Sequence, residues 1–165
     1  MLDAKMEQRL NQHIGEELYA SHLYLSMSAH FSAEGFDGFA NWLRKQSQEE
    51  YGHGMKIYNY INEQTGRVIL KAIPEPKTKF ASHVEVFEDV LAHEQKVTRQ
   101  INDLVNLAIQ LGDHATHVFL QWFVTEQVEE ESQASEVLAK VKLVGDNGPG
   151  LLALDRDMGS RTSAE

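Results

Sequence analysis

Four stretches of the sequence place an acid, or an acid beside a histidine or an amide, inside an otherwise apolar helical stripe. Moving one charged carboxylate into a protein core costs several kcal/mol unless a partner compensates it. Four such costs in a chain of 165 residues indicate one shared partner, and a metal centre would neutralise all of them together. The residues concerned are Glu17, Glu50 with His53, Glu94, and Gln127 with Glu130.

The second of these stretches has a spacing that suits metal binding. Glu50 and His53 are three residues apart, so both side chains lie on one helical face and can bind the same ion. Di-iron helical bundles combine such a Glu-x-x-His pair with single glutamates from other helices. Carboxylate oxygens with one imidazole suit Fe(II), Mn(II) or Zn(II). We therefore predict a carboxylate-rich metal site, with a buried polar network that holds no metal as the alternative.

Helical periodicity accounts for most of the chain and predicts the helices that must position these residues. We expect long helices at about residues 4–33, 38–65, 82–110 and 115–144, and a short one at about 150–159. Ser82 with Glu85 forms a capping box at the start of the third helix. The connector from Arg67 to about Ala81 can run the full length of a bundle.

The predicted fold class is therefore all-α: a four-helix bundle with a long crossover between the second and third helices plus a short C-terminal fifth helix. We expect one domain over residues 1–165. Each of the acidic positions then lies about 14 to 19 residues from its nearest helix–helix turn, or about 21–29 Å along the helix axis. The periodicity alone does not require this agreement, which indicates that the residues converge near the middle of the bundle.

Further side chains surround the predicted centre. Glu49, Glu126 and Glu129 add carboxylates beside the inward faces, either as a solvated acidic run or as an extra metal position. Tyr24 lies two turns beyond Glu17 and is either a hydrogen-bond or electron donor near the metals or a core tyrosine. Gly52 and Gly54 predict close approach of another helix or chain. We interpret the remaining histidines as surface residues: His13, His22, His30, His83, His93, His114 and His117.

The composition excludes several classes of protein. A net charge of −10 argues against nucleic-acid binding and suits a protein that attracts cations. The absence of cysteine excludes disulfides, thiolate zinc sites and iron–sulfur clusters. The first residues lack the apolar core of a signal peptide, and no apolar run approaches the roughly 20 residues of a membrane span. We expect a cytoplasmic protein that binds neither membrane nor nucleic acid.

These segments together resemble the ferritin family, specifically the non-haem bacterial ferritins. The resemblance covers nearly the whole chain and is carried by residues 16–19, residues 49–53, Glu94 and residues 122–130. It implies a hollow shell of 24 identical subunits. Such a shell would oxidise Fe(II) with oxygen or hydrogen peroxide and store a ferric oxide mineral.

The resemblance also implies roles for single residues. The first iron position of a di-iron ferroxidase centre would be held by Glu17, Glu50 and His53. The second would be held by Glu94, Glu130 and the bridging Glu50, with Gln127 adjacent. A third iron position of bacterial members matches Glu49, Glu126, Glu129 and Glu130. Tyr24 matches a tyrosine beside the centre.

Three departures narrow the resemblance. Bacterioferritins and rubrerythrins have a second Glu-x-x-His, whereas this chain has Gln127 and Glu130 at that spacing. Tyr51 replaces the methionine that binds haem in bacterioferritin, so haem is not expected. The carboxylates that line the three-fold channel of animal ferritins match His117 and Leu120, so that route for iron is not carried over.

Three functions fit the sequence. The first is a ferroxidase and iron-storage shell. The second is a soluble di-iron oxidase or peroxidase without mineral storage, which would need a substrate cavity beside the metals if it acts on an organic molecule. The third is a structural bundle that binds a divalent metal without turnover.

Overall fold

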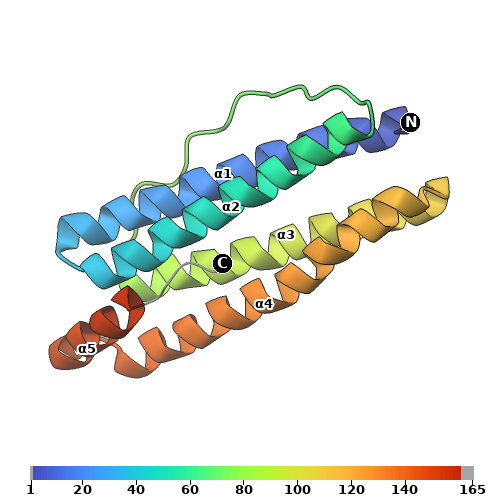
Figure 1. Ribbon diagram of the computed structural model, residues 1–165. Helices are drawn as coiled ribbons and strands as arrows, with labels where there is room; N and C mark the ends of the chain where they lie inside the picture. The colour runs from blue at the N-terminus through green and yellow to red at the C-terminus, as the bar shows by residue number, and fades with distance from the viewer. Residues whose placement is uncertain (1, 161–165) are drawn as a thin grey trace.

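The computed structural model describes residues 2–160, and the elements found there are all helices. Their order confirms the predicted all-α architecture, and each boundary lies within three residues of the expected one (Figure 1). No helix among the described residues is long and apolar enough to cross a membrane. The helices are α1 (Ala4–Glu34), α2 (Asp37–Glu63), α3 (His83–Leu111), α4 (His114–Val144) and α5 (Gly148–Gly159).

Local sequence sets where the long helices end. Gly35 adopts a φ of +82° after α1, a left-handed conformation that glycine reaches without strain. Ser82 Oγ accepts a hydrogen bond from the Glu85 amide at 3.1 Å, as the predicted capping box requires. The returning bond differs from the expectation, because the Glu85 carboxylate accepts from the Ala81 amide, one residue before the cap.

Two antiparallel helix pairs, α1 with α2 and α3 with α4, make the bundle (Figure 1). The connector between Glu63 and His83 runs lengthwise along the outside of α1, which confirms the predicted crossover. Asn11 holds its first part, since its side chain donates to the Arg67 carbonyl at 2.9 Å and accepts from the Ile69 amide at 2.7 Å. Ser26 Oγ donates to the Lys77 carbonyl at 2.8 Å and holds its second part.

The interior consists of two apolar clusters with a polar level between them. One cluster lies at the α5 end and includes Phe31, Phe87 and Met158. The other lies at the opposite end and includes Leu10 and Phe123. The buried polar residues between the two clusters include Glu17, Glu50, His53, Glu94, Gln127 and Glu130. This level is where the sequence analysis placed the converging acids.

Close approach was predicted at two glycines of α2, Gly52 and Gly54, and the structure shows it at Gly54. A Cβ added at Gly54 would lie 3.4 Å from the Glu17 Cβ, so the small residue lets α1 and α2 approach beside the polar level. A Cβ added at Gly52 would meet nothing within 4 Å in this chain. Among the described residues of this chain, no other helix comes close to Gly52, and the alternative of an approach by another chain stays a prediction.

α5 packs closely against Gly38, near the start of α2. A Cβ at Gly38 would lie 1.6 Å from the backbone oxygen of Asp155, whose Oδ1 also accepts from the Phe39 amide at 2.9 Å. Gly38→Ala should therefore displace α5 and lower the free energy of unfolding by about 1–3 kcal/mol, the usual cost of overpacking. Chemical denaturation would measure the change.

Gly52→Ala is the matched control in the same helix. Nothing lies within 4 Å of its added methyl group, and alanine is the better helix former, so this variant should gain up to about 1 kcal/mol. Equal stability of the two variants would contradict the assigned packing of α5 on α2.

Candidate metal centre

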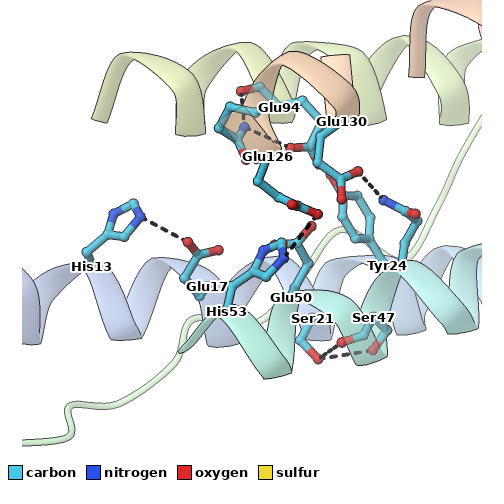
Figure 2. A network of polar contacts seen from close by, with 12 residues as sticks. His13, Glu17, Ser21, Tyr24, Ser47, Glu50, His53, Glu94, Glu126 and Glu130 are labelled. Carbon is cyan, nitrogen blue, oxygen red and sulfur yellow. Dashed lines mark hydrogen bonds and ion pairs between the residues drawn. The ribbon is translucent and has the colours of Figure 1, made fainter. Parts of the chain in front are cut away.

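Each of the four long helices contributes a buried carboxylate to the polar level (Figure 2). Glu17 comes from α1, Glu50 from α2, Glu94 from α3 and Glu130 from α4, and each is at most 3% exposed. His53 joins them from α2, with its Nδ1 3.1 Å from Glu50 Oε2. The structure therefore brings together the side chains that the sequence analysis expected to converge.

Three sets of ligand-type side chains in the described part of the chain have ligand atoms within 4.8 Å of one another. The first set is Glu17, Glu50 and His53, and the second is Glu50, Glu94 and Glu130. Glu50 belongs to both sets, so it lies where a carboxylate could bridge two ions. The third set is His53, Glu126 and Glu130.

Burial and mutual repulsion make three of these acids unusually weak. The pKa of Glu50 lies well above its ordinary value because of burial and then the charges of Glu94, Glu17 and Glu130. Burial raises the pKa of Glu94 to about 7, although Tyr24 and Gln127 oppose the shift through hydrogen bonds. Burial and Glu94 raise the pKa of Glu130 to about 7. Without cations the cluster therefore retains protons near neutral pH.

Glu17 differs because a histidine compensates it. Burial alone would raise the pKa of Glu17, but the charge and hydrogen-bonding capacity of His13 outweigh that effect and lower it. His13 Nε2 lies 3.0 Å from Glu17 Oε1, and His13 is only 3% exposed. The prediction of a surface position for His13 is therefore wrong. The available signal was its spacing, because a residue four positions before Glu17 lies on the same helical face.

His93 was also assigned to the surface, and this assignment is wrong too. It is 7% exposed, and its ring centroid lies 5.8 Å from that of Tyr24 and 6.0 Å from that of Tyr19. Burial lowers the pKa of His93 to about 4, so the imidazole is neutral near pH 7. It thus fills the space between α1 and α3 beside the acids without adding charge.

Neutral donors orient the acids on α3 and α4. The Tyr24 hydroxyl donates to Glu94 Oε1, and burial together with Glu94 raises the pKa of Tyr24 well above its ordinary value. Gln127 Nε2 donates to Glu94 Oε2 at 3.2 Å. Gln46 Nε2 donates to Glu130 Oε2 at 2.8 Å and was missed by the sequence analysis, although it lies one turn before Glu50. Such second-sphere donors hold ligand atoms in place.

Two carboxylate oxygens remain available in the interior. Glu17 Oε2 and Glu50 Oε1 are buried, and no amide, hydroxyl or imidazole donor among the described residues reaches them. When Glu50 is protonated, its carboxyl group can donate a hydrogen bond to the Glu17 carboxylate. Orphaned carboxylate oxygens beside an imidazole fit a hard divalent cation such as Fe(II).

An open hollow of about 600 Å³ lies beside His53, between α2 and α4. The sequence carries no sign of such a cavity, because the offset of two helices cannot be read from one sequence. The Trp122 ring centroid lies 5.3 Å from that of His53, in an edge-on contact, and 4.2 Å from Lys56 Nζ. The hollow is lined by Glu49, Gly52, His53, Met55, Lys56, Asn59, Trp122, Glu126 and Glu129.

The acids of the expected third position divide between two settings. Glu126 comes within 3.9 Å of His53 Nε2 and belongs to a compact ligand set with His53 and Glu130. Glu49 and Glu129 line the hollow but belong to none of the three compact sets among the described residues. Leu120 is one of the two positions matched to the three-fold channel of animal ferritins. It is fully buried in the apolar core, so within this chain its side chain is not available to line a channel.

The raised pKa values predict how stability depends on pH. In the metal-free folded chain the pKa of Glu94 and Glu130 is about 7, against 4.5 for an ordinary glutamate. The folded state therefore binds these protons more tightly, and stability is lost as pH rises from about 4.5 through about 7. Glu94→Gln or Glu130→Gln should raise the free energy of unfolding by on the order of 3 kcal/mol at pH 8, and hardly at pH 4.5.

Thermal and urea unfolding of chelator-treated protein at the two pH values would measure this difference. Glu63→Gln is the matched control, since Glu63 is exposed on α2. If neither buried variant is more stable than the parent protein at pH 8, the assigned repulsion among the acids is wrong.

Comparison with known proteins agrees with this geometry. A sequence model of the family described as Ferritin-like domain matches residues 7–144. The chain is 39% identical over 165 residues to a bacterial non-heme ferritin of Staphylococcus aureus, covering 100% of this chain and 99% of that protein. Its fold is similar to an open pore ferritin from the hyperthermophilic archaeon Archaeoglobus fulgidus, with a TM-score of 0.97 and 43% identity over 98% of this chain and 100% of that chain. An engineered closed form of that ferritin gives a TM-score of 0.98 with 43% identity, over 99% of this chain and 100% of that chain. With a family match over most of its length and relatives that align from end to end, the chain belongs to the ferritin family.

Proposed function

We propose that this chain is a ferroxidase and a subunit of an iron-storage shell. Fe(II) is oxidised by oxygen or hydrogen peroxide at the centre within each subunit, and the ferric product is stored as an oxide mineral inside a shell of 24 copies in the cytoplasm. The observation that carries the proposal is the pair of buried ligand sets that share Glu50. The similarity to a bacterial non-heme ferritin over the whole chain supports it.

In this proposal iron is the substrate, and each residue has a distinct role. Glu17, Glu50 and His53 hold the first Fe(II), while Glu50, Glu94 and Glu130 hold the second. Glu50 bridges the two ions and sets their separation. Gln127 and Tyr24 position Glu94, as the hydrogen bonds to its two oxygens indicate. His13 and Gln46 act in the same way on Glu17 and Glu130.

The chemistry follows from the charge of the ligands. Anionic carboxylates stabilise Fe(III) more than Fe(II) because the attraction grows with the charge of the ion. Two bound Fe(II) ions each lose one electron, and one oxygen molecule takes both electrons and two protons to become hydrogen peroxide. Binding of the cations displaces protons from Glu50, Glu94 and Glu130, whose pKa values are raised in the metal-free chain.

The hollow beside His53 supports a role for the third iron position. Glu126 and Glu129 line it together with Glu49, and Lys56 is the single cationic side chain among the lining residues. A lining with an excess of negative charge attracts cations. We propose that Glu49, Glu126 and Glu129 receive iron that moves between the centre and the growing mineral.

The same hollow keeps a second candidate function, a di-iron oxidase or peroxidase without storage. Its volume of about 600 Å³ is within the range of small-molecule sites. Binding sites for organic ligands carry few charged groups, however, whereas this lining includes three acids and one lysine. The charge of the lining therefore favours cations over an organic substrate.

The oxidation rate of Fe(II) tests the proposed centre. Glu50→Gln and His53→Gln should each lower the initial rate of Fe(III) formation at least about 100-fold, because each removes a ligand from a site built for the transition from Fe(II) to Fe(III). Stopped-flow absorbance after mixing metal-free protein with Fe(II) in air would measure the rate, and Glu63→Gln is the control. Parental rates in both variants would favour a bundle that binds metal without turnover.

Iron retained per chain distinguishes storage from oxidation alone. After repeated additions of Fe(II) in air, the protein is passed through a sizing column and iron is assayed in the protein peak. Storage predicts tens of irons per chain in a large particle. Two or three irons per chain, as the centre itself could hold, would support the oxidase and contradict the shell.

A further inference from the structure

An exposed tryptophan and a lysine contact each other at the wall of the hollow beside His53. The Nζ of Lys56, on α2, lies 4.2 Å from the ring centroid of Trp122, on α4, within the range of a cation–π contact. Trp122 is 39% exposed, so packing in the core does not account for its place. Neither side chain binds iron in the proposed function, and the contact between them has no role there.

The acids of the same hollow are within reach of Lys56. Lys56 follows His53 by three residues in α2, so the two side chains start about 5–6 Å apart on one helical face. The Glu126 carboxylate comes to 3.9 Å from His53 Nε2 (Figure 2). The four-carbon stem of a lysine is flexible enough to cover such a distance. Among the described residues, the ammonium nevertheless lies on the Trp122 ring and not against Glu126 or Glu129.

The two places open to this ammonium differ little in free energy. A cation–π contact at an exposed site and an exposed ion pair are of similar strength, and tryptophan offers the strongest aromatic face. The residue at position 122 therefore decides where the ammonium lies. With no aromatic face at that position, the nearby partners left to Lys56 are the acids that line the hollow with it. An ammonium on those acids would compete with iron for the same oxygens.

We propose that Trp122 holds the Lys56 ammonium away from the acids of the hollow and so keeps these acids open to incoming iron. This inference rests on the proposed function, because it concerns the third iron position. Trp122 is a positioning residue, since it acts on iron through Lys56 and is not itself a ligand. The contact lets the hollow contain a lysine without losing Glu126 and Glu129 to an ion pair.

Anaerobic equilibrium dialysis of Fe(II) against the full-length metal-free protein tests this proposal. Glu126→Gln should remove the third binding event per chain and thereby identify it. Trp122→Leu should weaken that event about three- to fivefold, because Lys56 then pairs with the acids. Lys56→Met should bind the third ion at least as tightly as the parent protein. Lys5→Met, which removes one positive charge at an exposed position of α1, is the control and should match the parent.

The double variant separates positioning from a structural role of Trp122. In protein that already carries Lys56→Met, Trp122→Leu should have almost no further effect, because no ammonium is left to reach the acids. If Trp122 served only to pack against His53, its loss would weaken the third ion equally with or without Lys56. Trp122→Phe keeps an aromatic face and should retain most of the parental affinity. The loss in Trp122→Leu should also shrink at about 0.5 M NaCl, since salt screens exposed ion pairs.

Each contrary result overturns a different part of this account. Third-ion binding that is unchanged in Glu126→Gln would overturn the third iron position and with it the role of Trp122, while the di-iron centre is tested separately by the oxidation rate. Parental affinity in Trp122→Leu would leave that position standing and overturn the positioning of Lys56. So would an equal loss from Trp122→Leu with and without Lys56→Met.

Discussion

Mutual repulsion among buried carboxylates is the constraint on which this structure depends. Glu17, Glu50, Glu94 and Glu130 come from four different helices and lie at one level of the bundle. His13 more than offsets the effect of burial on the pKa of Glu17, with help from His53 and Glu50, whereas burial leaves the pKa values of the other three raised, and the cluster takes up protons in the absence of cations. Protons and metal ions therefore compete for the same oxygens. Cations bound among these acids would recover the free energy that the fold loses by burying them, and metal binding would then be coupled to stability.

The rest of the fold holds the four acids in these positions. Apolar clusters pack on both sides of the polar level, where they keep the helices from closing onto it and keep bulk water out. The crossover is held to α1 by Asn11 and Ser26, so the two helix pairs keep one relative position along the bundle. Gly54 lets α1 approach α2 beside Glu17. Donors such as Gln46 and Tyr24 orient the carboxylates without adding charge, which leaves the positive charge to be supplied by the metal.

Sequence periodicity was sufficient to predict the helices and the crossover. It also predicted the converging acids, because each acid interrupts a long apolar stripe. The surface assignment was wrong for His13, whose spacing of four residues from Glu17 was not used, and for His93, whose burial depends on the neighbouring helix. Gln46 was missed for a similar reason, as its partner Glu130 is distant in the sequence. The hollow beside His53 depends on the offset between helices, which no local pattern encodes.

Proton release on metal binding tests the central claim most directly. Anaerobic titration calorimetry of Fe(II) into metal-free protein at pH 7, repeated in buffers of different ionisation enthalpy, counts the protons released per chain. The account predicts release of about one proton from Glu94 and Glu130 together, whose pKa values are about 7, and a further contribution from Glu50, whose pKa is raised well above its ordinary value by burial. Glu50→Gln should release fewer protons than the parent protein. Tight binding of two Fe(II) per chain with no proton release in any buffer would contradict the account, because the acids would then have been charged in the empty interior.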